Sequence, residues 1–197
     1  MDVKRAACAI LIAIVSAGCS SQELPTDGQP VVQLWDGGNV FVQPRKTLIL
    51  ALWADGQVVS RVDEKGKCRL QFASLLDVPK ARLMVGHIEP KRVSEIMAEI
   101  SRAGFFETDK YAGLVRPDGP NVVLFARHAA RTNEIQHEAV DDTITHSAMT
   151  TPENKEFGKM WDSVMDALRT IHVQDWRPVG PKDKIVTEIP WGESGKK

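Results

Sequence analysis

The pattern of apolar and polar residues is most regular across residues 47–62 (TLILALWADGQVVSRV), where it predicts a β-hairpin. The dipeptide Asp55-Gly56 interrupts this stretch, and Asp-Gly is favoured in two-residue hairpin turns because it tolerates positive φ. A turn of these two residues sets Trp53 opposite Val58 on one face of the hairpin. The first strand is apolar on both faces, which is typical of a strand that is covered on both sides.

Other β-rich stretches predict further strands. Residues 31–42 contain two short runs around an Asp-Gly-Gly-Asn sequence, which favour either a small hairpin or a loop that covers the sheet. Gly86 lies inside another run and indicates a bulge or a point of close backbone approach. A second hairpin is expected near residue 130. The predicted strands outside the first hairpin are residues 69–75, 82–88, 121–127 and 134–140.

Two stretches carry apolar residues at helical spacing. The first, residues 90–103, starts at Pro90, whose missing N–H is not needed in the first turn of a helix. Gly104 follows it and predicts a left-handed stop. The second helix is predicted over residues 151–171, with its apolar residues on one side. Together with the strands, these helices predict an α+β fold with two layers, in which a mostly antiparallel sheet is packed by two helices.

The first nineteen residues have the organisation of an export signal. Lys4 and Arg5 give a positive start, and residues 6–15 form an uncharged, mostly apolar run. That run is long enough for a signal peptide and too short for a membrane span, which needs about 20 residues.

The end of this signal, Ala17-Gly18-Cys19, resembles the lipobox of bacterial lipoproteins, with Ser16 at the position where leucine is usual. The resemblance implies that Cys19 is acylated, becomes the mature N-terminus and anchors the protein. Ser20 stands where an aspartate often signals inner-membrane retention, so the resemblance implies the outer membrane, facing the periplasm, in a host with two membranes. Two alternatives stay open: cleavage after Ala17 with free secretion, and a Cys19 that simply lies near the end of a signal.

The cysteine count depends on this choice. Cys8 is lost with the signal, and if Cys19 carries lipid, Cys68 is the single thiol of the mature chain. If Cys19 is not lipidated, a Cys19–Cys68 disulfide becomes available in an oxidising compartment. The neighbours of Cys68 form no catalytic motif, and we interpret it as a structural cysteine.

These signals divide the chain into four parts. Residues 1–18 are the signal peptide, and residues 19–30 are the lipidated cysteine and a polar, turn-rich tether. Residues 31–178 form a single α+β domain. Residues 179–197 are a C-terminal tail, in which residues 184–189 are a candidate edge strand.

Composition and charge narrow the function classes. Hydrophobic residues make up 43% of the chain and charged residues 26%, which are ordinary values for a globular protein. The formal net charge is -1, so there is no electrostatic case for a nucleic-acid partner. The expected partners are the membrane, through the N-terminal lipid, and a protein of the cell envelope.

Several short motifs resemble a loose group of uncharacterised exported bacterial proteins. The group has a strand ending in ADG, a G-x-I/L-x-P sequence that leads into a helix, a GFF sequence that ends it, and a late aromatic-x-Pro. The matching residues are Ala54-Asp55-Gly56, Gly86-His87-Ile88-Glu89-Pro90, Gly104-Phe105-Phe106 and Trp176-Arg177-Pro178. The resemblance covers residues 47–178, and it implies neither an assigned activity nor a functional residue.

Three histidines, His128, His137 and His146, are spaced nine residues apart and suggest a metal site. If a loop of four residues joins the two strands of the second hairpin, His128 and His137 lie diagonally on one face with Cβ atoms about 7 Å apart. Zinc bridges side chains at that separation. A shift of one residue in the loop moves His137 to the other face. The competing interpretation is that these histidines are solvated or make ordinary hydrogen bonds.

The chain has five tryptophans and one tyrosine. Trp35, Trp176 and Trp191 lie in irregular segments and form a candidate recognition patch, because tryptophan is favoured at binding hot spots. The alternative is that they cover sheet edges and the rim of the core.

No sequence motif for nucleophilic catalysis, phosphate binding or dinucleotide binding is present. We therefore expect a lipid-anchored envelope protein that acts as a non-catalytic binding or assembly module without a cofactor. One alternative is a metal-dependent envelope hydrolase that holds zinc with His128 and His137. Another is a small-ligand sensor or carrier with a pocket between the sheet and the helices.

Overall fold

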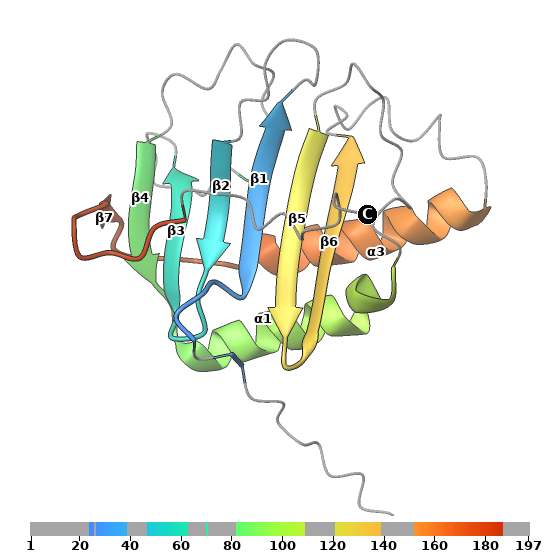
Figure 1. Cartoon of the computed structure of the whole chain (residues 1–197), viewed down its shortest axis with the longest axis horizontal. Coiled ribbons are helices and arrows are strands. Elements are labelled where there is room, and N and C mark those ends of the chain that lie inside the picture. Colours follow the sequence, from blue (N-terminus) through green and yellow to red (C-terminus); the bar gives the residue numbers. More distant parts are fainter. Residues whose placement is uncertain are drawn as a thin grey trace, which may run out of the picture.

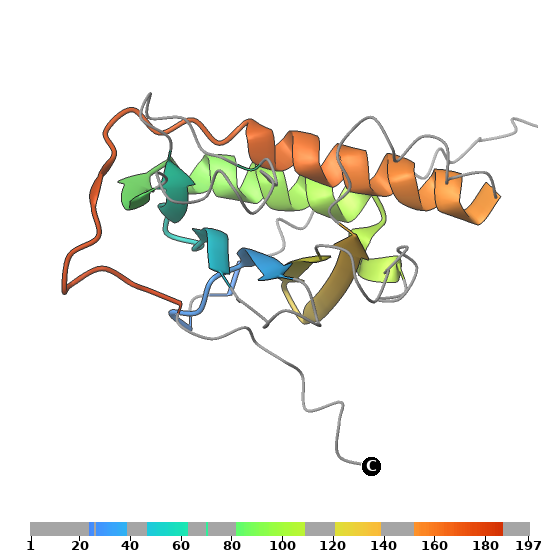
Figure 2. The same cartoon turned by 90° about the horizontal axis from the view of Figure 1, so that it is seen from above.

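A computed structural model of the 197-residue chain describes residues 24–25, 27–38, 47–62, 70, 82–108, 121–138 and 152–186. Within these residues a seven-stranded antiparallel sheet carries helices α1 and α3 on one face (Figure 1; Figure 2). The predicted α+β fold is thereby confirmed. The helices are α1 (Pro90–Arg102), the 3-10 turn η2 (Phe105–Glu107) and α3 (Pro152–Arg169). The strands are β1 (Val32–Gly38), β2 (Thr47–Leu52), β3 (Gln57–Val62), β4 (Arg82–His87), β5 (Asn121–His128), β6 (Arg131–Glu138) and β7 (Arg177–Pro178).

The sheet has the strand order β6-β5-β1-β2-β3-β4-β7. β1 pairs with both β2 and β5, so the described part of the stretch predicted as a small hairpin or covering loop, residues 31–38, provides a central strand, and residues 39–42 lie outside the described residues. The side chains of β1 explain its central position, because Leu34 faces the helices and Trp35 is buried on the other side. The glycines that suggested a turn lie at the end of β1, where its register with β5 shifts between Asp36 and Gly38.

The β2–β3 hairpin is present, but its predicted register is wrong by one residue. Leu52 pairs with Val58, and the backbone N–H of Trp53 donates to the carbonyl of Gln57 at 3.0 Å. The loop therefore has three residues, of which only Gly56 takes a positive φ, at 93°. Trp53 consequently lies opposite Gln57, on the face away from the helices.

The β5–β6 hairpin also differs from the expectation. His128 pairs with Arg131, so the turn has two residues in place of the predicted four. It contains no glycine, and Ala129 takes the positive φ of 54° that glycine usually supplies. Arg131 accounts for this register, because its guanidinium donates to Glu107 at 2.8 Å and to Ser101 at 2.7 Å. The turn is thus set by contacts with α1 and η2 and not by its own residues.

Replacing Ala129 with glycine is expected to raise the free energy of unfolding by about 0.5–1 kcal/mol, because glycine adopts this φ without strain. Ala130→Gly is the matched control, since Ala130 has no positive φ, and it is expected to lower stability by a similar amount through unfolded-state entropy. Urea unfolding of the mature chain measures both. Equal losses in the two variants would contradict the turn described here.

Two apolar clusters lie on opposite faces of the sheet. The cluster between the sheet and the helices includes Val93, Ile96, Met97 and Ile100 of α1. The second cluster, on the other face, comprises Trp35, Leu48, Ala51, Trp53, Val59, Val85 and Val123. Both faces of the central strands are therefore buried, as the apolar first strand of the β2–β3 hairpin predicted.

Residues 170–186 pass from the end of α3 around the β4 edge of the sheet to the second cluster (Figure 2). The edge strand forms at β7, where Pro178 pairs with Met84, and the described part of the predicted strand 184–189 is not in a strand. A side chain holds residues 184–186 in place, because the amide of Gln57 donates a hydrogen bond to the backbone carbonyl of Lys184. The segment covers the second cluster with Val179 and Val186.

Gly104 and Gly86 have roles that the sequence predicted. Gly104 follows α1 with a φ of 86°, which confirms the left-handed stop. Gly86 is a point of close approach, since a Cβ atom there would lie 2.2 Å from Cγ1 of Val173. The observed helices α1 and α3 lie within the predicted ranges.

The predicted tether, residues 19–30, is docked on the domain over its described part. Leu24 packs against the cluster under the helices, and Pro30 is buried. Asp27 pairs with Arg127, and the carbonyl of Gly28 accepts a hydrogen bond from the indole of Trp53 at 3.1 Å. A polar, turn-rich composition did not reveal these contacts because their partners lie far along the chain.

Candidate functional site

The β5–β6 register separates the two histidines predicted to share a metal. His128 pairs with Arg131, whereas His137 pairs with Val122. Both side chains face the helices, but they lie six positions apart, which is about 20 Å along the strands. The predicted diagonal pair is therefore wrong. Among the residues described, no group of three or more His, Cys, Asp or Glu side chains is placed to hold a metal ion, and His146 lies outside them.

His137 is enclosed between β6 and α3. Its ring lies 5.0 Å from the ring of Phe157 and 4.9 Å from that of Trp161, with an edge-on geometry in both cases. Only 5% of the residue is exposed, and this burial lowers the pKa of His137 from 6.5 to about 4. Its Nδ1 atom makes no hydrogen bond with the part of the chain that is described. His137 therefore acts at neutral pH as an uncharged aromatic side chain in the core.

His128 belongs to a different group of contacts. It is buried beside Phe106, with ring centroids 6.2 Å apart. The guanidinium of Arg131 lies 4.8 Å from the centre of the same Phe106 ring. Asn133, in β6 two residues after Arg131, donates to the carbonyls of Phe105 and Thr108. These contacts fasten β6 to the end of α1, so the surroundings of His128 are structural.

Trp35 and Trp176, the two described members of the predicted recognition patch, do not lie together on an exposed surface. Trp35 is 3% exposed and its indole donates to the side chain of Gln33 at 3.1 Å. Trp176 is half-buried and packs against the helix-side cluster, so the two residues lie on opposite faces of the sheet. Trp191 lies outside the described residues. The sequence placed Trp35 in an irregular stretch, which favours an exposed side chain. The structure places it in the central strand β1, where both faces are covered.

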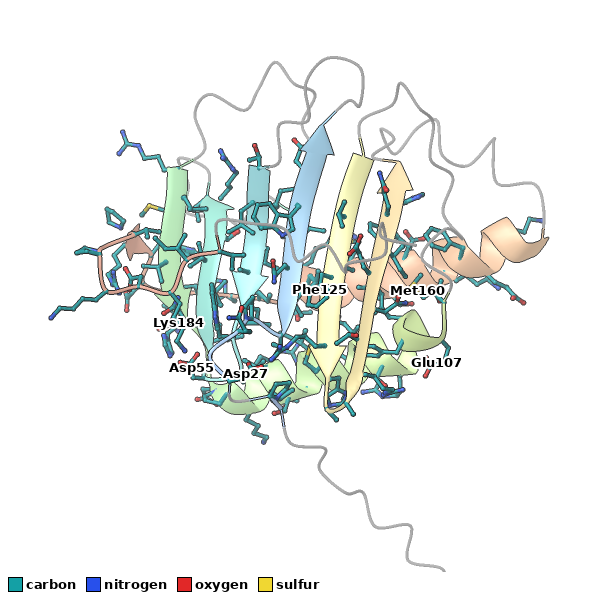
Figure 3. All side chains as sticks on the ribbon, in the orientation of Figure 1. Asp27, Asp55, Glu107, Phe125, Met160 and Lys184 are labelled. Carbon is teal, nitrogen blue, oxygen red and sulfur yellow. The ribbon has the colours of Figure 1, made fainter. Side chains whose placement is uncertain are left out.

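The most connected polar group lies at one end of the sheet, which we call the turn end. It comprises residues 27–31 before β1, the β2–β3 turn, the start of α1 and the β5–β6 turn. The strand register brings these together, because Val32 pairs with both Leu52 and Ala126, and Gln57 pairs with His87. Figure 3 shows Asp27, Asp55 and Lys184 gathered there.

Asp55 is the centre of contacts at the turn end. Its carboxylate accepts hydrogen bonds from Lys184 at 2.5 Å and from the backbone N–H of Gln57 at 3.2 Å. Burial raises the pKa of Asp55, but these donors outweigh it and leave the pKa below its ordinary value. His87 reaches the backbone carbonyl of Asp55 at 3.1 Å. The β2–β3 turn is thereby held to both β4 and the C-terminal segment.

Asp27 and Arg127 form the second ion pair of the turn end, at 2.5 Å. The hydrogen bond from Arg127 lowers the pKa of the Asp27 carboxyl. The pair joins residues 100 positions apart in the chain, and Asp55 and Lys184 are 129 apart. No local motif marks these four residues, so the sequence offered only the Asp55-Gly56 turn signal at this surface.

Comparison with protein-family models, with curated proteins and with solved structures finds no match to this chain. None of the described helices is both long and apolar enough to cross a membrane.

Proposed function

We propose that this protein is an exported, lipid-anchored protein of the cell envelope that serves as a non-catalytic binding or assembly module. The observation that carries the proposal is the place of Cys19, at the end of a signal-like stretch and five residues before Leu24. Leu24 already packs against the domain core. Every described element lies after Cys19, so cleavage before this residue leaves all of them in the mature chain.

The surroundings of two polar side chains, His137 and Asp183, favour structural roles over catalytic ones for these residues. His137 is held between Phe157 and Trp161. Asp183 pairs with Arg177 at 2.5 Å, and the hydrogen bond from Arg177 lowers the pKa of Asp183 to about 2. General acid–base catalysis works best with a group whose pKa lies near the operating pH. The shifts of His137 and Asp183 move them away from that range and favour structural roles.

Anchoring is tested by expressing the full chain and its Cys19→Ala variant in a bacterial host. The parent chain is expected to begin at Cys19, to carry acyl chains in an intact-mass measurement and to sediment with membranes. The Cys19→Ala variant is expected to lose the added mass and to leave the membrane fraction. A parent chain with an unmodified N-terminal Gly18 would refute lipidation and favour simple secretion.

A further inference from the structure

The place of the turn end, close to Cys19 along the chain, bears on how an anchored domain is oriented. We infer that the turn end is the membrane-facing surface of this protein, held against the lipid headgroups by the short link to Cys19. This inference rests on the proposed lipid anchor. The partner to which it commits is the surface of a phospholipid bilayer.

The first step is the place where the chain joins the fold. Residues 27–31 are fastened within the turn end by an ion pair and hydrogen bonds, and Leu24 packs against the cluster under the helices. The N–H of Val31 donates to the carbonyl of Leu52 at 2.7 Å, and the carbonyl of Val31 accepts from Arg127 at 2.9 Å. The link to the membrane therefore starts at this end of the domain.

The second step is the length of that link. Four residues lie between Cys19 and Leu24, and the five residue-to-residue steps of a fully extended chain span at most about 18 Å. The eight residues of β5 extend over about 25 Å. Because the link is shorter than the sheet, the domain cannot stand on the opposite end of the strands while Cys19 is embedded. The turn end therefore stays next to the bilayer in every orientation that the link allows.

The third step is the charge of the surface. Exposed acidic residues (Asp27, Asp55, Glu89) lie at the turn end together with the exposed Lys91 and the half-buried Lys184 and Arg127. Such a mixed surface has no strong preference for anionic lipid, and salt screens its charges beyond about 8 Å. The covalent link, and not electrostatic attraction, therefore sets the orientation. We expect the orientation to be insensitive to ionic strength.

The experiment measures energy transfer from a fluorophore on the protein to acceptor-labelled headgroups in phosphatidylcholine vesicles. The lipidated full-length chain carries Cys68→Ser and one new labelling site. Ala130→Cys places the donor in the β5–β6 turn, and Arg82→Cys is the matched control at the far end of β4. Both positions are exposed, and they lie about 20 Å apart along the strands. Transfer is expected to be stronger from residue 130 than from residue 82, and the ratio is expected to be the same at low and at high salt.

A second variant tests whether the link sets this difference. Twelve glycine and serine residues inserted between Ser20 and Leu24 form a flexible chain that lets the domain rotate. The ratio of transfer from the two sites is then expected to fall toward one.

The outcomes separate this inference from the proposed function. Equal transfer from the two sites, or stronger transfer from residue 82, in a chain whose mass shows the lipid overturns the inference alone. A ratio unchanged by the insertion overturns it too, because the link would then not set the orientation. An unmodified N-terminus in the mass measurement overturns the proposed anchor and the inference with it.

Discussion

Replacing Gly56 with alanine is expected to lower the free energy of unfolding by about 3 kcal/mol, from backbone strain and steric overlap together. Gly56 has a φ of 93°, where an L side chain is strained, and an added Cβ would lie 2.0 Å from the carbonyl oxygen of Ile88. That carbonyl is part of the backbone, so no side-chain rotation relieves the overlap. The change also threatens the 2.9 Å hydrogen bond from the N–H of Ile88 to the carbonyl of Gly56.

Gly104→Ala is the matched control for this prediction. Gly104 has a similar φ of 86°, but a Cβ atom there meets nothing within 4 Å, so only backbone strain of about 1–2 kcal/mol applies. Urea unfolding of the mature chain compares the two variants. If Gly56→Ala costs no more than Gly104→Ala, the close approach of the β2–β3 turn to Ile88 is not what requires glycine.

Acidification from pH 7 to pH 4 is expected to remove about 3 kcal/mol of stability through His137 alone. Burial lowers the pKa of His137 in the folded state to about 4 from an ordinary value of 6.5. The unfolded chain therefore binds a proton on this imidazole below pH 6.5, while the folded chain stays neutral until about pH 4. Stability attributable to His137 is complete above pH 6.5 and is lost progressively as the pH falls to 4.

The carboxyl groups with lowered pKa values act in a different pH range. Asp27, Asp55 and Asp183 each contribute stability above their ordinary value of 3.8 that is lost as the pH falls below it. These carboxyl groups therefore change the stability at lower pH than His137 does. The interval from pH 6.5 to pH 4.5 is where the histidine is expected to dominate.

His137→Phe keeps an aromatic ring between Phe157 and Trp161 and removes the titrating group. It is expected to flatten the stability curve between pH 6.5 and pH 4.5, whereas His172→Gln, which changes an exposed side chain, is expected to leave the slope in place. An NMR titration of the His137 ring gives an independent reading if the variant folds poorly. A ring that titrates near pH 6.5 in the folded protein contradicts the enclosed environment described here.

Helix α1 shows what could be predicted from local sequence. Its apolar residues recur at the spacing that places them on one face, and all four of them are buried against the sheet. Pro90 begins it and Gly104 ends it through preferences of their own backbones. Such features depend on residues within one or two turns, so reading them requires no knowledge of the tertiary structure.

The hairpins show where local reading fails. An Asp-Gly dipeptide correctly indicated the β2–β3 turn, but Asp55 keeps a negative φ while its carboxylate binds the N–H of Gln57 and the ammonium of Lys184. In the β5–β6 turn, Arg131 is held by Ser101 and Glu107. Each register depends on partners distant in sequence, and one residue of slip exchanges the two faces of a strand.

The candidate functional site also depends on contacts between residues that are distant in the sequence. The proposed zinc pair relied on an assumed loop length, and the observed register places His128 and His137 at opposite ends of the hairpin. The turn end was not foreseen, because its ion pairs join Asp27 to Arg127 and Asp55 to Lys184 across most of the chain. Neither charge pattern nor spacing along the chain marks such pairs.

The sequence by itself determined the α+β class, the positions of the helices and the existence of both hairpins, because periodic burial and backbone preference are properties of neighbouring residues. Only the tertiary structure decided that β1 is central, that the segment around Leu24 is docked, and which residues meet at the turn end. These outcomes depend on register and on contacts over long sequence separations. Their free energy comes from burial shared between segments that are far apart in the sequence, so no single stretch encodes them.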